Sequence, residues 1–200
     1  MALSSIELCS SALIKLGAEP ISSFEDGSAE ARVAGSLYPI VRDALLSAHP
    51  WSFATAQVEL ARLAAEPVTD FTYAHQLPVD FLRALSAGDD GRGRGLVYRI
   101  VNRELHTNAA SVVLTYVFRP SEGDFPAFFQ SLLVSRLAAE FCLPLTENTT
   151  RARQLRELAE DELRLAKLTD GQQDTPTRID GFPVVEVRAA GVRGLGRCEP

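Results

Sequence analysis

Apolar positions recur at helical spacing in four segments of the chain. Ser4 followed by Glu7 forms a capping box, and the apolar stripe after it stops at Gly17, so we predict a first helix over residues 4–16. Three further stripes predict helices over residues 28–48, 125–143 and 149–169.

Proline and aspartate set the expected shapes and ends of these helices. Pro39 lies inside the second helix and lacks a backbone N–H, so we expect a kink near residues 36–38 or two shorter helices. We expect Asp124 to cap the third helix, which should end near Pro144. Phenylalanine and leucine cover most of the circumference of this third helix, which predicts that it is central and buried.

Between about residues 52 and 120 the apolar period changes to the alternation of strands. The fold class is therefore α+β, a small helical bundle with an antiparallel β insertion, in a single domain over residues 1–170. A short helix is expected over residues 80–87, and a loop over the charged glycine run 89–95. Four short strands are predicted, over residues 53–62, 71–77, 96–102 and 111–119.

The last thirty residues lack helical periodicity and are rich in Gln, Asp, Pro and Gly. A segment of this composition becomes ordered only when it binds to another surface. It contains one apolar patch, which is suited to such binding. We therefore expect an extended C-terminal tail over residues 171–200 that docks on a partner. The contact residues predicted in this tail are Phe182, Val184, Val185 and Val187.

Charge and cysteine content exclude several classes of protein. Twenty basic against 26 acidic residues give a net charge of -6, which disfavours general binding to nucleic acid or to an anionic membrane. Apolar runs fall short of the roughly 18 to 20 residues of a membrane span, and the N-terminus lacks a signal-peptide pattern. Three cysteines, far apart and outside any CxxC spacing, favour a reducing compartment over disulfides or a zinc site.

Catalytic and metal-binding motifs are weak throughout the chain. The histidines His49, His75 and His106 show no HxxxH or HExxH spacing, and no serine lies in a GxSxG elbow. We therefore predict no catalytic residue, no metal site and no cofactor. A rival interpretation stays open, in which a small cytosolic enzyme assembles its site from scattered residues such as His75, Asp80 and Arg83.

The fourth predicted helix has a charged outer face. Arg151, Arg153 and Arg156 crowd its first turns, where the helix dipole disfavours positive charge. Pairing with Glu157 and Glu160 one turn on can offset this charge. The alternative is that the three arginines face an acidic partner surface.

A series of segments matches one known family in order and composition. These segments are residues 6–9, 12–21, 37–43, 49–54 and 73–83. Together with the two late helices they resemble the head-to-tail adaptor, or connector, proteins of tailed phages, which include the tail tubular protein A group and the adaptors of phage-like gene transfer agents. The resemblance spans about residues 5–170.

The resemblance implies a structural protein without catalytic activity. Many copies would form a ring, typically dodecameric, beneath the portal protein at the head-tail interface of a virion or phage-like particle assembled in the bacterial host cytoplasm. Such a ring continues the DNA channel, passes double-stranded DNA without sequence-specific binding, and receives the next tail component, a stopper or tail terminator. The alternative within this class is that the chain is itself a stopper or tail-tube starter, and a phage, a prophage and a gene transfer agent all remain open as its source.

An acidic lining suits a DNA channel because negative charge repels phosphates and lets the duplex slide. On this basis Glu157, Asp161 and Asp170 are expected on the channel side. The tail and the three arginines of the fourth helix are expected at the partner interface. A nucleic-acid regulator would need strongly salt-dependent DNA binding, which the balance of charge disfavours.

Overall fold

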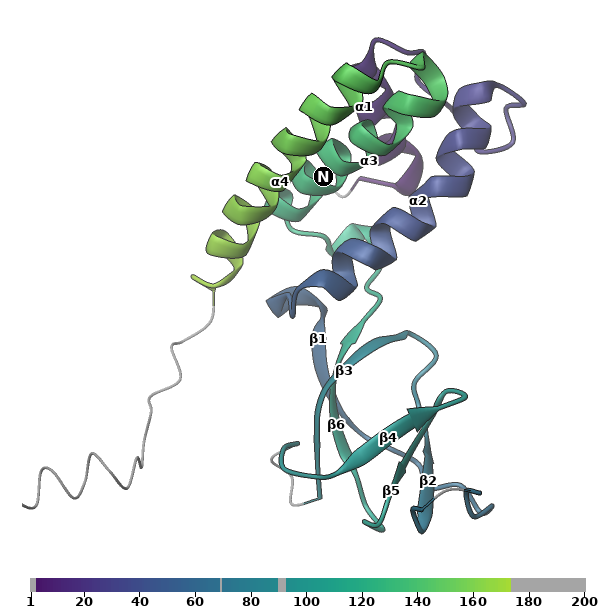
Figure 1. Cartoon of the computed structure of the whole chain (residues 1–200), viewed down its shortest axis with the longest axis vertical. Coiled ribbons are helices and arrows are strands. Elements are labelled where there is room, and N and C mark those ends of the chain that lie inside the picture. The colour runs from purple at the N-terminus through teal and green to yellow at the C-terminus, as the bar shows by residue number, and fades with distance from the viewer. Residues whose placement is uncertain (1–2, 69, 90–92, 174–200) are drawn as a thin grey trace, which may run out of the picture.

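The computed structural model describes residues 3–68, 70–89 and 93–173. It confirms the α+β fold class, with four main helices and an antiparallel β module inserted between the second and the third (Figure 1). The helices form a bundle at one end of the molecule, and the β module lies at the other end (Figure 1). The helices are α1 (Ser5–Leu16), α2 (Ala29–Ala48), α3 (Ala127–Thr146) and α4 (Thr149–Asp170).

The β module contains two three-stranded antiparallel sheets, with strand orders β1-β6-β3 and β2-β5-β4. The first sheet continues from the bundle, because β1 follows α2 and β6 leads back to α3. An apolar cluster of its own, which includes Leu105 and Leu114, fills the module. The strands are β1 (Thr55–Glu59), β2 (Tyr73–Gln76), β3 (Phe81–Gly88), β4 (Tyr98–Val101), β5 (Glu104–Thr107) and β6 (Val113–Phe118).

Two expectations for the β module are wrong. The short helix expected over residues 80–87 is strand β3, because pairing with β6 along its length overrides the local pattern. Strand β5 was not predicted at all. It follows a tight turn at Asn102 and Arg103, whose positive φ values of 48° and 65° define a hairpin turn that lacks the usual glycine signal.

The predicted start and end of α1 are confirmed. Ser4 accepts a hydrogen bond from the backbone N–H of Glu7, and the Glu7 carboxylate accepts one from the Ser4 backbone at 2.7 Å. Gly17 closes the helix at φ 71°, a conformation that glycine adopts without strain, and its N–H donates to the carbonyl of Ile14.

Proline divides neither of the two helices that contain it. Helix α2 runs through Pro39 as one 20-residue element, and the proline ring lies on its exposed side. Buried neighbours such as Tyr38 and Val41 hold the helix on both sides of the lost hydrogen bond. Helix α3 likewise continues through Pro144 to Thr146. Its N-cap is Pro126, and Asp124 lies in the 3-10 turn before it, so the predicted cap is wrong.

Helix α3 is the centre of the bundle, as predicted. It packs against α1, α2 and α4, and residues such as Phe129, Leu133 and Leu137 are completely buried. By length and composition alone this helix could cross a membrane, contrary to the expectation that no apolar run is long enough. Slightly more than half of its apolar window is buried inside the bundle, as in a core helix.

An aromatic cluster fills the joint between the bundle and the β module. Trp51 is fully buried, donates from Nε1 to the carbonyl of Leu45 at 3.0 Å, and lies edge-on to Phe129 with ring centroids 5.3 Å apart. Phe53 contacts the same rings and also Phe125. The chain therefore leaves the bundle through its most densely packed aromatic region.

A polar network ties the return strand to α2. Glu122, just after β6, accepts hydrogen bonds from Tyr38 at 3.0 Å and Arg42 at 3.1 Å. Arg119 donates two hydrogen bonds to Asp43, and Arg42 donates to the same carboxylate. Although burial opposes it, the hydrogen bonds from Arg119 and Arg42 hold the pKa of Asp43 below its ordinary value.

Replacing Trp51 with alanine is expected to lower the free energy of unfolding by about 3–5 kcal/mol, because a large buried ring is lost and a cavity remains. Circular dichroism during urea unfolding measures this change. Val79→Ala is the control, since Val79 is 91% exposed. An unfolding midpoint for Trp51→Ala equal to that of the control would contradict the role of the joint.

Candidate functional site on helix α4

Helix α4 lies along α3 with a narrow contact face of small side chains. Ala152, Ala159 and Ala166 are buried there, and alanine allows the two helix axes to approach closely. Leu155 and Leu163 border this face and are partly buried against the core, while most of the other long side chains of α4 are exposed. This arrangement leaves most of the circumference of α4 available to a partner (Figure 1).

Three leucines project from α4 into solvent. Leu158 is 58% exposed, Leu165 is 64% exposed and Leu168 is 65% exposed. At about 100° per residue they lie on one side of the helix, away from the alanine face. These exposed leucines make this side of α4 a candidate surface for interaction.

The three arginines expected at a partner interface do not form one cluster. Arg151 is half-buried and donates to the carbonyl of Lys15 at 3.2 Å, so it is held by α1. Arg153 and Arg156 are exposed, and helix geometry directs them to the side opposite Arg151. Only these two remain available to an acidic partner.

Glu157 and Asp161 are exposed, as a channel-facing position requires. Asp161 forms an ion pair with Arg164 at 3.0 Å, and this is the one ion pair within α4 in the described part of the chain. The predicted pairs of Glu157 with Arg153 and of Glu160 with Arg156 are not formed there.

Asp170 is not on a channel surface, and that prediction is wrong. It is 4% exposed, and its carboxylate accepts hydrogen bonds from the Ser52 backbone N–H at 3.1 Å and from the Ser52 hydroxyl at 2.7 Å. His49 Nε2 lies 3.7 Å from the same carboxylate. Asp170 therefore fastens the end of α4 to the start of the β module, which sequence periodicity could not reveal because the contact spans 118 residues.

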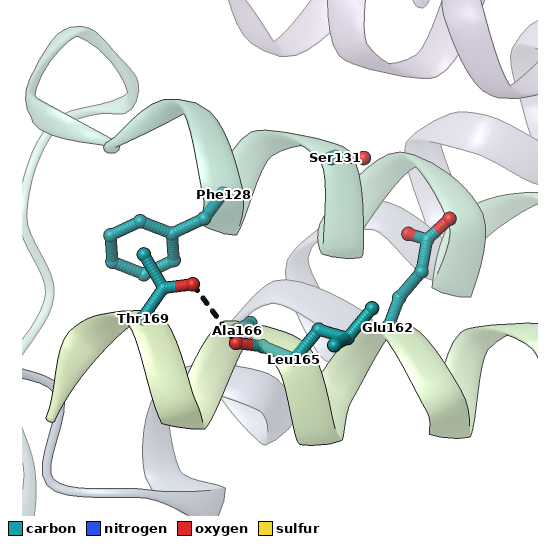
Figure 2. Close-up of a pocket in the computed structure, with 6 residues that line it drawn as sticks. All are labelled: Phe128, Ser131, Glu162, Leu165, Ala166 and Thr169. Carbon is teal, nitrogen blue, oxygen red and sulfur yellow. Dashed lines mark hydrogen bonds between the residues drawn. The ribbon is translucent and has the colours of Figure 1, made fainter.

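A hollow of about 320 Å³ lies between α3 and α4, and we call it the α3/α4 groove. Figure 2 shows the ring of Phe128 and Thr169 at one end and Glu162 at the other, with the carboxylate of Glu162 directed toward α3. Oxygen Oε2 of Glu162 is buried and has no hydrogen-bond partner among the residues that the structure describes. The lining residues are Phe128, Ser131, Glu162, Leu165, Ala166 and Thr169.

A second hollow, of about 630 Å³, lies at the joint below the end of α4. It is lined by His49, Ser52 and Asp170 together with Arg94 and Gln173. Burial lowers the pKa of His49, Asp170 opposes the shift, and Lys167 and Arg83 add to it. The Ser52 hydroxyl donates to Asp170 and not to the imidazole, so these side chains are not arranged as a nucleophile and its base.

The residues of the rival enzyme interpretation do not meet in either hollow. His75 is fully buried in β2, and His106 is 5% exposed in β5. Within residues 3–68, 70–89 and 93–173, no three His, Cys, Asp or Glu side chains gather as a metal site would require. Burial raises the pKa of the Cys9 thiol to about 12, so this thiol stays protonated at neutral pH and is not a nucleophile.

The predicted tail contacts Phe182, Val184, Val185 and Val187 lie outside the described residues, which end at Gln173. Comparison of the chain with protein-family models and with curated proteins finds no match.

Neither the burial of a carboxylate oxygen of Glu162 nor the exposure of the three leucines together was predicted from the sequence. The leucines carried a signal, because positions 158, 165 and 168 repeat at helical spacing outside the predicted core stripe. Glu162 carried none, since its burial depends on the packing of α3 against α4.

Asp170→Ala is expected to lower the free energy of unfolding by about 1–3 kcal/mol, because the Ser52 N–H and hydroxyl lose a charged acceptor at a partly buried site. Asp161→Ala is the matched control on the same helix, and its exposed ion pair is expected to contribute no more than about 0.5 kcal/mol. Urea unfolding of both variants measures the difference. Equal losses for the two variants would refute the fastening role of Asp170.

His49 is expected to make stability depend on pH below about 6.5, the pKa of histidine in an unfolded chain. Because the pKa of His49 is lower in the folded protein, its stabilising contribution is complete above about pH 6.5 and is lost as the pH falls through the folded value. Urea unfolding at several pH values between about 7.5 and 5.5 should therefore show a steeper loss for the native chain than for His49→Gln. Parallel curves would contradict this assignment.

Proposed function

We propose that this chain is a structural head-to-tail adaptor. Copies of it form a ring beneath a portal protein, continue the channel for double-stranded DNA, and receive the next tail component. The proposal assigns the protein to a virion or phage-like particle and gives it no catalytic step.

The exposed leucine stripe of α4 is the observation that carries the proposal. A monomer that exposes Leu158, Leu165 and Leu168 on one helix gains free energy by covering them, and each buried leucine contributes roughly 1.5–3 kcal/mol. In a ring, every copy offers the same surface to its neighbour, so one such stripe supplies a contact at every interface.

The arrangement of the chain supports the same function. The resemblance implies a small helical bundle that bears a β insertion, and the fold has this layout (Figure 1). The acidic Glu157 and Asp161 on the exposed side of α4, with a net charge of -6, suit a wall along which DNA slides.

Negative-stain imaging tests the proposal, with the protein alone and after co-expression with the portal protein of the same structural-gene cluster. We expect an added ring at one end of the portal. The double variant Leu158→Glu and Leu168→Glu should stay folded and lose the ring, because both side chains are exposed in the monomer. Val79→Glu, at an exposed position of the β module, is the control and should keep it.

Deletion of residues 174–200 tests the predicted role of the tail in the same assay. The deletion keeps every described residue of α4, so the monomer should stay folded while attachment to the portal is lost. A native chain that leaves the portal undecorated would overturn the adaptor function. Decoration of an isolated tail component instead would favour a neighbouring position in the tail.

A further inference from the structure

The α3/α4 groove contains a carboxylate oxygen for which the described residues supply no hydrogen-bond donor. Oxygen Oε2 of Glu162 is buried there and accepts no hydrogen bond from residues 3–68, 70–89 or 93–173. A buried acceptor without a donor destabilises the fold, and a guanidinium group offsets this cost by supplying both a hydrogen bond and positive charge. The groove is therefore suited to an arginine side chain.

The surface on both sides of Glu162 is apolar. Leu165 and Phe128 form the walls of the groove toward the C-terminal end of α4. Leu158, one turn toward the other end, is 58% exposed. A segment with an arginine followed by a large apolar residue complements this order of side chains.

The chain carries such a segment shortly after the last described residue. Arg178 is the first basic residue beyond Gln173, and Phe182 follows it by four positions. We propose that residues 178–182 of the same chain bind along the groove in the isolated protein, antiparallel to α4, with Arg178 on Glu162 and Phe182 on Leu158.

The reach of the chain permits this arrangement. Helix geometry places Glu162 about 12 Å from Asp170 along α4 and about 16 Å from Gln173, since the coiled backbone continues to Gln173, and it places Leu158 about 6 Å beyond Glu162. The five residues from Gln173 to Arg178 span up to about 17 Å when extended, and the four from Arg178 to Phe182 up to about 14 Å. A tether this short gives an effective concentration of the order of millimolar, which favours the same chain over a second molecule.

This inference goes beyond the proposed function and does not depend on ring formation. It assigns the tail a position in the free protein, where it covers Leu158 and Leu165 before any partner is met. A partner that captures Phe182 then uncovers both leucines. Portal binding and exposure of the stripe on α4 are coupled in this way.

Disulfide formation in the full chain tests the contact. The variant combines Leu165→Cys with Thr177→Cys in a Cys198→Ser background, and the natural Cys9 and Cys142 are buried and do not compete. We expect an intramolecular disulfide, detected by mass spectrometry after proteolysis. The matched control replaces Leu165→Cys with Arg164→Cys, which lies at the same height on α4 about a quarter turn away, and should give little of it.

Charge reversal at the groove identifies the pairing. Glu162→Arg in the double-cysteine chain should lower the disulfide yield by about tenfold, the factor expected for one charge-assisted hydrogen bond, and adding Arg178→Glu should restore it. Equal yields for the two cysteine pairs, disulfides only between molecules, or no effect of charge reversal would each overturn the inference. None of these outcomes changes the result of the portal imaging, so the two proposals fail separately.

Discussion

The packing of aromatic rings around Trp51 is the constraint on which the rest of the structure depends. Trp51 is the residue through which the chain passes from α2 into β1, and it is held by rings from α3. The bundle and the β module therefore share one buried region, although each also has an apolar cluster of its own. Because α3 supplies Phe128 and Phe129 to this region, the central helix positions the module as well as the bundle.

Polar contacts also join the bundle to the module, at both of the chain segments that connect them. Asp170 holds the outgoing chain at Ser52, while Asp43 and Glu122 hold the returning chain through Arg119 and Arg42. These contacts join residues that are 76 to 118 positions apart. Most of their partners are partly shielded from water, where hydrogen bonds between charged groups are stronger than on an open surface.

The helices could be predicted from sequence because their signals are local. The capping box at Ser4 and the stop at Gly17 lie within the element they define, and the fold class followed from the change of apolar period. Strand β3 and the tight turn before β5 could not be predicted, because the first depends on its partner strand and the second lacks glycine. In the candidate site, the helical spacing of Leu158 and Leu165 carried a signal that the prediction did not use. The burial of Asp170 and of the Glu162 oxygen Oε2 depends on contacts with residues distant in the sequence, which carry no such signal.

Strands β1 and β6 leave and re-enter the bundle side by side, with Thr55 paired to Val117 (Figure 1). Partners in an antiparallel pair lie only about 5 Å apart, so the two ends of the inserted module lie close together where they join the bundle. The outer part of the module, beyond the residues of β3 and β6 that pack on the bundle core, can therefore differ in length while the attachment to the helices stays the same. In evolution and in protein engineering alike, such a joint lets the part of the molecule that meets one neighbour vary while the helical part stays constant.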